Sequence, residues 1–159
     1  HHWPLLRWPL RILVVCFGVS TAVAADMLTG IWKQNMAKSK YDPANLAPKS
    51  GSTKWEAVGA DGLKWVADGV DAQGKPTHSE FSGKFDGKDY PVKGIPVEDT
   101  RAYKRIDDFT YDFVSKKAGK VTTTSHMVIS RDGKTRTFTT TGTDAEGHKV
   151  NNTAVYDKQ

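Results

Sequence analysis

The sequence has a single cysteine among its 159 residues, and Cys16 lies within the apolar run 12–24 near the N-terminus. Arg7 and Arg11 precede this run, and Ala22-Val23-Ala24 offers small residues for cleavage. A basic flank, a short apolar core and an A-x-A site are typical of a secretory signal peptide. A helix needs roughly twenty apolar residues to cross a bilayer, and this run is shorter. We therefore expect residues 1–24 to be a cleaved leader rather than a membrane anchor.

The chain from residue 25 onward has no cysteine, which excludes disulfides from the expected mature protein. Exported proteins without disulfides must be stabilised by a hydrophobic core and a complete set of backbone hydrogen bonds. A segment of this length is sufficient for one such core. The sequence therefore predicts one domain, 25–159, in a periplasmic or secreted protein with no membrane span after cleavage.

A concentrated patch of basic charge is also lacking. Without Arg7 and Arg11, 21 basic residues face 18 acidic ones, so the net charge falls from +5 to +3. The adjacent basic pairs are Lys104-Arg105 and Lys116-Lys117, and the other basic residues are scattered singly. Nucleic-acid-binding domains usually gather such charge into a patch or stripe. We expect solvated outer faces and no nucleic-acid partner.

Signatures of catalysis and metal binding are missing as well. The sequence has no nucleophile-elbow pattern, glycine-rich phosphate loop or metalloprotease motif. It also has no His-x-x-His, Cys-x-x-Cys or EF-hand spacing. We therefore predict a protein that is not an enzyme and has no catalytic residues, metal site or cofactor. One alternative is a haem held in a β-barrel by His126, although a strand histidine more often faces solvent.

Helical periodicity is absent after the leader, and a period of two replaces it. In 109–113 the aromatic residues Phe109, Tyr111 and Phe113 alternate with Thr110 and Asp112, as in a half-buried strand. Turn-forming pairs such as Asp-Gly recur along the chain at regular intervals. The strands predicted between these turns are 28–34, 52–59, 63–70, 77–85, 89–93, 99–106, 109–116, 120–130, 134–143 and 148–157.

Ten consecutive antiparallel strands would leave two open edges in a flat sheet, and closing the sheet removes both. The sequence therefore predicts an all-β fold, a single up-and-down antiparallel barrel, with a two-sheet sandwich as the alternative. The segment 37–51 is predicted to be a loop that either has a function or plugs an opening, because Pro43 and Pro48 disfavour a helix.

The two ends of this barrel resemble those of fatty-acid-binding proteins. The resemblance rests on Gly30-x-Trp32-Lys33 in the first strand and on 155–159, Val-Tyr-Asp-Lys-Gln, at the end of the chain. Fatty-acid-binding proteins and lipocalins form the calycin superfamily of up-and-down barrels, and the ten strands fit the former better. The chain also resembles small exported bacterial proteins of no assigned function, through the phrases KSKYDP, DGKDYPVKG, KRIDD, DGKTRT and AVYDKQ.

Two departures limit what this resemblance implies. Fatty-acid-binding proteins carry a helix-turn-helix lid between their first two strands, where this chain has the proline-containing loop 37–51. They hold the fatty-acid carboxylate with arginines and a tyrosine, with Arg-x-Tyr on the last strand. This chain has Ala154-x-Tyr156 there. The tyrosine matches and the arginine does not, so binding of a fatty-acid carboxylate does not follow from the resemblance.

A barrel of this size can hold one small ligand among the inward residues of its strands. The aromatic residues expected to point inward are Trp55, Trp65, Phe81, Phe85, Phe109, Tyr111, Phe113, Phe138 and Tyr156. They could either line a pocket or fill the core. Arg101, Tyr103 and Arg105 share one face of their predicted strand. If that face pointed inward, the three side chains would bind an anion. We expect both arginines on the outside instead, because an unpaired buried charge is costly.

These observations favour an exported monomer that binds a small, partly hydrophobic molecule noncovalently inside its barrel. The candidate ligand-binding residues are Trp55, Trp65, Phe81, Tyr103, Arg105, Tyr111, Phe113, Phe138 and Tyr156. One alternative is an interaction or structural module of the cell envelope with a filled barrel. Another is a barrel enzyme that acts on a small ligand at the open end.

Overall fold

The computed structural model describes residues 25–159, and the predicted leader, 1–24, lies outside the described residues. The described part consists of strands, with one short helix and one 3-10 turn. The elements are α1 (Ala25–Leu28), β1 (Gly30–Gln34), β2 (Lys40–Asp42), η1 (Ala44–Leu46), β3 (Ser50–Val58), β4 (Gly62–Val70), β5 (Pro76–Lys84), β6 (Tyr90–Lys93), β7 (Thr100–Asp107), β8 (Thr110–Lys117), β9 (Lys120–Ile129), β10 (Thr135–Thr143) and β11 (Lys149–Lys158).

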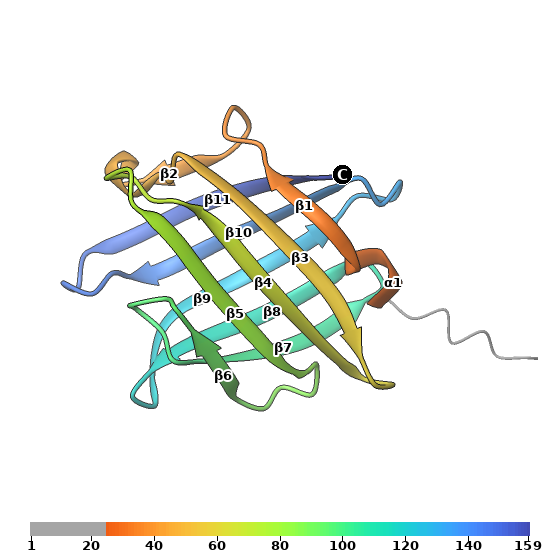
Figure 1. Cartoon of the computed structure of the whole chain (residues 1–159). Coiled ribbons are helices and arrows are strands. Elements are labelled where there is room, and N and C mark those ends of the chain that lie inside the picture. The colour runs from red at the N-terminus through yellow and green to blue at the C-terminus, as the bar shows by residue number, and fades with distance from the viewer. Residues whose placement is uncertain (1–24) are drawn as a thin grey trace, which may run out of the picture.

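The strands form one antiparallel meander that closes on itself (Figure 1). Each strand from β3 to β10 pairs with the next one along the chain, and β1 pairs with β3 on one side and β11 on the other. Pairing of β1 with β11 closes the barrel and removes its open edges. The predicted ten-stranded up-and-down barrel is confirmed, and the two-sheet sandwich is wrong because the first and last strands are hydrogen-bonded to each other.

The segment between β1 and β3 differs from the loop predicted for 37–51, because it contains one additional strand and one turn of 3-10 helix. In this segment β2 pairs with β11, with Tyr41 opposite Asn152 in the register. The Asn152 side chain accepts a hydrogen bond from the Asp42 backbone N–H at 3.2 Å. The segment has no helix-turn-helix, as the two prolines predict. Within residues 25–159, no helix has the length and apolar character needed to cross a membrane.

The half of the barrel next to α1 is filled by side chains. Leu28, Trp32 and Tyr111 have no exposed surface, and the Trp32 indole N–H donates to the Leu28 carbonyl at 2.8 Å. Leu63 and Ile129 complete this packed end near the neighbouring turns. Truncating a buried tryptophan such as Trp32 to alanine costs about 3 to 5 kcal/mol of stability. The filled half therefore holds the barrel together, and any interior site lies toward the other end.

Candidate ligand-binding site

The interior is hollow on the side of the packed half that faces away from α1. A cavity of about 170 Å³ lies there, enclosed by inward-facing side chains of the barrel strands and one residue of the β6–β7 connection. Its lining residues are Thr53, Trp55, Trp65, Ala67, Ser79, Ile95, Arg101, Tyr103, Phe113, Met127, Arg136, Phe138 and Tyr156. We call this hollow the inner cavity.

A second hollow of about 250 Å³ lies at the open end of the barrel. We call it the mouth; it is framed by Leu46 of η1, by Val97 and Glu98 between β6 and β7, and by Asp144 after β10. The residues that line both hollows are Ile95, Arg101, Phe113 and Phe138. Because they share these walls, the two hollows adjoin and reach the lower part of the size range of small-molecule pockets, roughly 300 to 1,000 Å³.

The structure brings six of the nine predicted ligand-binding residues together around the inner cavity. These six are Trp55, Trp65, Tyr103, Phe113, Phe138 and Tyr156. Phe81 and Tyr111 are buried in the aromatic packing beneath them, and Arg105 is exposed. Phe85 packs on Tyr111 at 5.1 Å between ring centroids, whereas Phe109 lies in the β7–β8 turn beneath Arg131. The interior is therefore partly pocket and partly filled core.

The expectation that Arg101 lies outside the barrel is wrong. Its side chain lines the inner cavity and is only 14% exposed; Nη1 donates to the Tyr103 hydroxyl at 3.0 Å and Nη2 donates to the Glu98 carboxylate. Trp65 Nε1 donates to the same hydroxyl at 3.0 Å. Burial opposes the charge, but Tyr103 and Glu98 together raise the pKa of Arg101 above its ordinary value. The arginine is tolerated inside because a buried carboxylate accompanies it.

Arg105 does lie on the outside, despite sharing the alternation of Arg101 and Tyr103. The β7–β8 register shifts between Arg105 and Asp107, at the end of the barrel. The side chain is 40% exposed and forms an ion pair with Asp108 in the turn. Arg105 does not line the inner cavity, unlike six of the other candidate residues.

Arg136 on β10 lines the inner cavity and was missed by the sequence analysis. Its residue is 3% exposed, and its guanidinium carbon lies 4.4 Å from the ring centroid of Tyr156 and 5.3 Å from that of Trp32. Burial lowers the pKa of Arg136 to about 10. The alternation contained a signal for it, because Phe138 was expected to point inward and Arg136 is two residues away on the same face.

The unpaired polar atoms around the inner cavity are hydrogen-bond donors. Among the described residues, Trp55 Nε1, Arg101 Nε, and Nε and Nη2 of Arg136 are buried without a hydrogen-bond partner. The Tyr103 hydroxyl already accepts two hydrogen bonds, so its own hydrogen is available to an acceptor. Buried polar groups are normally paired, which makes this concentration of free donors unusual. The cavity is suited to a ligand that supplies acceptors.

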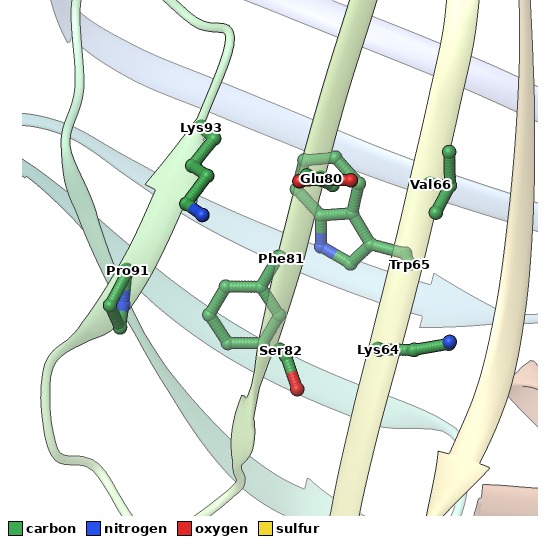
Figure 2. A pocket seen from close by; sticks show the side chains of 8 residues that line it. All are labelled: Lys64, Trp65, Val66, Glu80, Phe81, Ser82, Pro91 and Lys93. Atoms are coloured by element: carbon green, nitrogen blue, oxygen red, sulfur yellow. The ribbon is translucent and has the colours of Figure 1, made fainter.

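A third hollow, of about 390 Å³, lies on the outer wall of the barrel across β4, β5 and β6 (Figure 2). It forms where β6 is short: β5 and β6 are joined by two register pairs, Glu80 with Lys93 and Phe81 with Val92. Exposed residues such as Lys64, Glu80 and Lys93 border it. None of the unpaired buried atoms described above belongs to a residue that lines this groove. It is therefore a weaker candidate than the interior.

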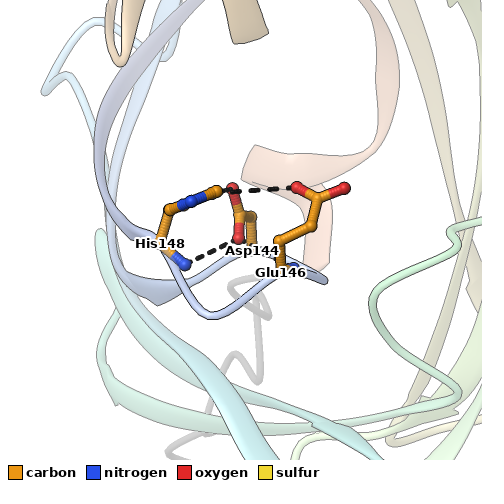
Figure 3. Close-up of side chains that lie close together, drawn as sticks. All are labelled: Asp144, Glu146 and His148. Carbon is orange, nitrogen blue, oxygen red and sulfur yellow. Dashed lines mark hydrogen bonds and ion pairs between the residues drawn. The ribbon is translucent and has the colours of Figure 1, made fainter.

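A cluster of Asp144, Glu146 and His148 lies in the turn between β10 and β11 (Figure 3). The Asp144 carboxylate accepts the backbone N–H groups of Glu146 at 2.9 Å and His148 at 2.8 Å. Asp71 in the β4–β5 turn accepts the N–H groups two and four residues later in the same way, at 2.9 and 2.8 Å. This shared arrangement stabilises a turn and accounts for the position of Asp144 without a metal.

His126 also lies away from the interior. It alternates with the buried Ser125 and Met127, its side chain is 55% exposed, and its Nδ1 lies 2.6 Å from the Asp112 carboxylate on β8. A histidine on the outer face cannot coordinate a haem iron inside the barrel, so the haem alternative loses the histidine on which it rested.

Comparison with known proteins gives the fold and no family. No protein-family model matches the chain, and no curated protein matches its sequence. The structure is similar to that of the N57A mutant of the fluorescent protein UnaG, at 15% identity over 84% of this chain and 97% of that one, with a TM-score of 0.59. Rv2717c from M. tuberculosis is similar at 13% identity over 86% and 95% of the two chains, with a TM-score of 0.57.

The S-type phycobiliprotein lyase CPES from Guillardia theta is also similar, at 8% identity over 85% of this chain and 90% of that one, with a TM-score of 0.54. Identities this low show a shared fold, which is the closed antiparallel up-and-down β-barrel expected from the sequence. Membership of the calycin superfamily stays a prediction. The site must be interpreted from the residues of this chain.

Proposed function

We propose that this protein binds a small, partly hydrophobic molecule noncovalently in its barrel interior. The observation that carries the proposal is the inner cavity, which is walled by aromatic rings and adjoins the mouth. Natural ligand sites are concave and mostly apolar, with a few convergent polar groups that fix orientation. The inner cavity has this composition, with Arg101, Tyr103 and Arg136 among its aromatic lining.

The half-filled interior supports the same proposal. The hydrophobic core extends from the packed half next to α1 into the walls of the inner cavity, where Trp55, Trp65 and Phe113 belong to both, so the barrel has a continuous core although the cavity itself is not filled. A module that only presented its outer face to a partner would gain stability from filling the cavity as well. An unfilled interior next to a mouth therefore favours a carrier or sensor over a purely structural module.

Native mass spectrometry of the protein purified from the cells that produce it tests this proposal. We expect a reproducible mass excess that disappears on denaturation and that belongs to an organic molecule small enough for the two hollows. The apo mass alone, together with tryptophan fluorescence that does not respond to a panel of lipids, haem and aromatic compounds, would contradict it. Trp55 and Trp65 line the inner cavity, so a ligand there must change their emission.

We further propose that the barrel acts as a monomer outside the cytoplasm after removal of residues 1–24. The apolar run 12–24 with its A-x-A site supports export, and the closure of β1 on β11 leaves a barrel that is complete within one chain. N-terminal sequencing of the mature protein and sedimentation analysis test these two points. A retained leader or a stable dimer would contradict them.

A further inference from the structure

Two arginines line the inner cavity, Arg136 buried and Arg101 with a side chain that is 14% exposed, and their surroundings differ. Arg101 has the buried carboxylate of Glu98 beside it. Among residues 25–159, Arg136 forms no ion pair with any acidic side chain, and no acidic residue lines the inner cavity. At the mouth, the Asp144 carboxylate is occupied by backbone N–H groups of its own turn. The inner cavity therefore holds one guanidinium charge that the protein itself does not balance.

The free atoms of Arg136 have the geometry of a specific recognition group. Nη1 points to the Met127 sulfur at 3.7 Å, whereas Nε and Nη2 have no partner. These two nitrogens form one edge of the planar guanidinium, and such an edge binds both oxygens of a carboxylate in parallel. An unpaired buried charge is strongly unfavourable, so a site that keeps one is expected to receive a partner.

The aromatic rings around Arg136 provide only part of what it needs. Its guanidinium carbon lies within 6 Å of the rings of Tyr156, Trp32, Trp55 and Phe138. Cation–π contacts of this kind stabilise the charge in part. They act on the faces of the rings and satisfy none of the N–H groups at the free edge. If Arg136 had only a structural role, these donors and the neighbouring Trp55 N–H would stay buried without a hydrogen-bond acceptor.

We propose that the ligand is a monocarboxylate with an apolar body, whose carboxylate binds the free edge of Arg136 in the inner cavity. A single negative charge balances the one unpaired guanidinium, and the Trp55 indole and Tyr103 hydroxyl are further donors to its oxygens. The apolar body lies against Phe113 and Phe138, which line both hollows, and extends into the mouth. This inference rests on the proposed function and specifies the chemistry of its ligand.

Two pairs of probes test the inference by isothermal titration calorimetry on the purified protein freed of bound molecules. The pairs are 2-naphthoate with 2-naphthamide and octanoate with octanamide, in which an acid and a neutral amide have nearly the same shape. We expect at least one acid to bind about tenfold or more tightly than its amide. The variant Arg136→Met should abolish that advantage. The matched control Arg131→Met, at an exposed arginine outside the cavity, should retain it.

A second variant keeps the test informative if Arg136→Met does not fold. Arg136→Lys retains the charge but lacks the two-nitrogen edge, and we expect it to keep only part of the preference for the acid. Equal binding of acid and amide, or a preference that survives loss of the Arg136 guanidinium, would overturn the inference while the proposed function stands. Binding of none of the four probes would also overturn the inference, whereas the proposed function fails only on the apo mass together with the unresponsive tryptophan fluorescence.

Discussion

Arg136 and Tyr156 are direct register partners on β10 and β11, and the arginine lies over the tyrosine ring at 4.4 Å. The resemblance to fatty-acid-binding proteins placed a tyrosine at 156 and left the arginine of that strand missing, with Ala154 in its place. The structure provides an interior arginine beside that tyrosine from the neighbouring strand. The barrel therefore has an interior cation although its last strand lacks the arginine of the Arg-x-Tyr motif.

The unpaired charge of Arg136 should lower the free energy of unfolding of the ligand-free protein. We expect Arg136→Met to raise the free energy of unfolding by about 1 to 3 kcal/mol, because it replaces an uncompensated buried charge with an apolar chain. Urea unfolding of the ligand-free protein measures this. Arg131→Met is the matched control and should stay within about 0.5 kcal/mol. A marked destabilisation by Arg136→Met would instead indicate that the ring contacts make this arginine structural.

Arg101 should behave in the opposite way, since it has a buried partner. Arg101→Met leaves the Glu98 carboxylate, which is 4% exposed, without its counter-charge. Breaking such a pair costs about 3 to 5 kcal/mol. Adding Glu98→Gln should recover a large part of this loss, because the remaining group is then neutral. If the double variant were as unstable as Arg101→Met, the ion pair would not be the source of the effect.

The sequence predicted the barrel and part of its interior for one reason, which is strict alternation along the strands. Trp55 and Trp65 face each other across β3 and β4 as that alternation requires. It failed at Arg105, which keeps the regular register opposite Tyr111 but lies at the end of the barrel, where its side chain turns to Asp108 in the β7–β8 turn. It also gave no sign of β2, whose three residues form a strand only by pairing with β11, far along the chain.

Arg136 was within reach of the same argument and was not found. The interpretation of β10 followed its aromatic residue, Phe138, and left out the charged residue on the same face. The prediction that Arg101 lies outside was wrong for a related reason, because it assumed that a buried arginine would have no acidic partner. Glu98 lies outside any predicted strand, so only the folded chain brings that carboxylate to Arg101.

The hydroxyl of Tyr103 should contribute more to the stability of the folded protein than that of Tyr111, although both residues are buried. Tyr103→Phe leaves Trp65 Nε1 and Arg101 Nη1 without the acceptor that they share. We expect a loss of about 1 to 3 kcal/mol for each donor left unpaired. The Tyr111 hydroxyl has no partner among the described residues, so Tyr111→Phe is the control and should be neutral or stabilising. Thermal unfolding of the two variants under identical conditions compares them; equal losses would contradict this assignment.

The pH dependence of ligand binding should show the lowered pKa of Arg136. This group is a base whose pKa falls to about 10 on folding, so its charge is present below that pH and is lost as the pH rises through it. The affinity of the bound acid should be constant between about pH 7 and 9 and should then fall by up to about tenfold per pH unit. The affinity of the neutral amide should not follow this curve.

Other groups that face Arg136 must be separated from this effect. Tyr156, Tyr103 and Arg101 all interact with its charge. Burial raises the pKa of Tyr156, so its ionisation comes later than that of a free tyrosine. Tyr156→Phe should therefore keep the fall near pH 10. A fall that moved or disappeared in this variant would assign the titration to the tyrosine instead.

A crystal structure of the protein soaked with 2-naphthoate is the most direct measurement of the central claim, that the interior of this barrel is a binding site. We predict that the naphthalene ring lies among Phe113, Phe138 and the residues of the mouth, with both carboxylate oxygens within hydrogen-bond distance of Nε and Nη2 of Arg136. Density for the acid in the outer groove bordered by Lys64, Glu80 and Lys93, with an unchanged inner cavity, would contradict the account.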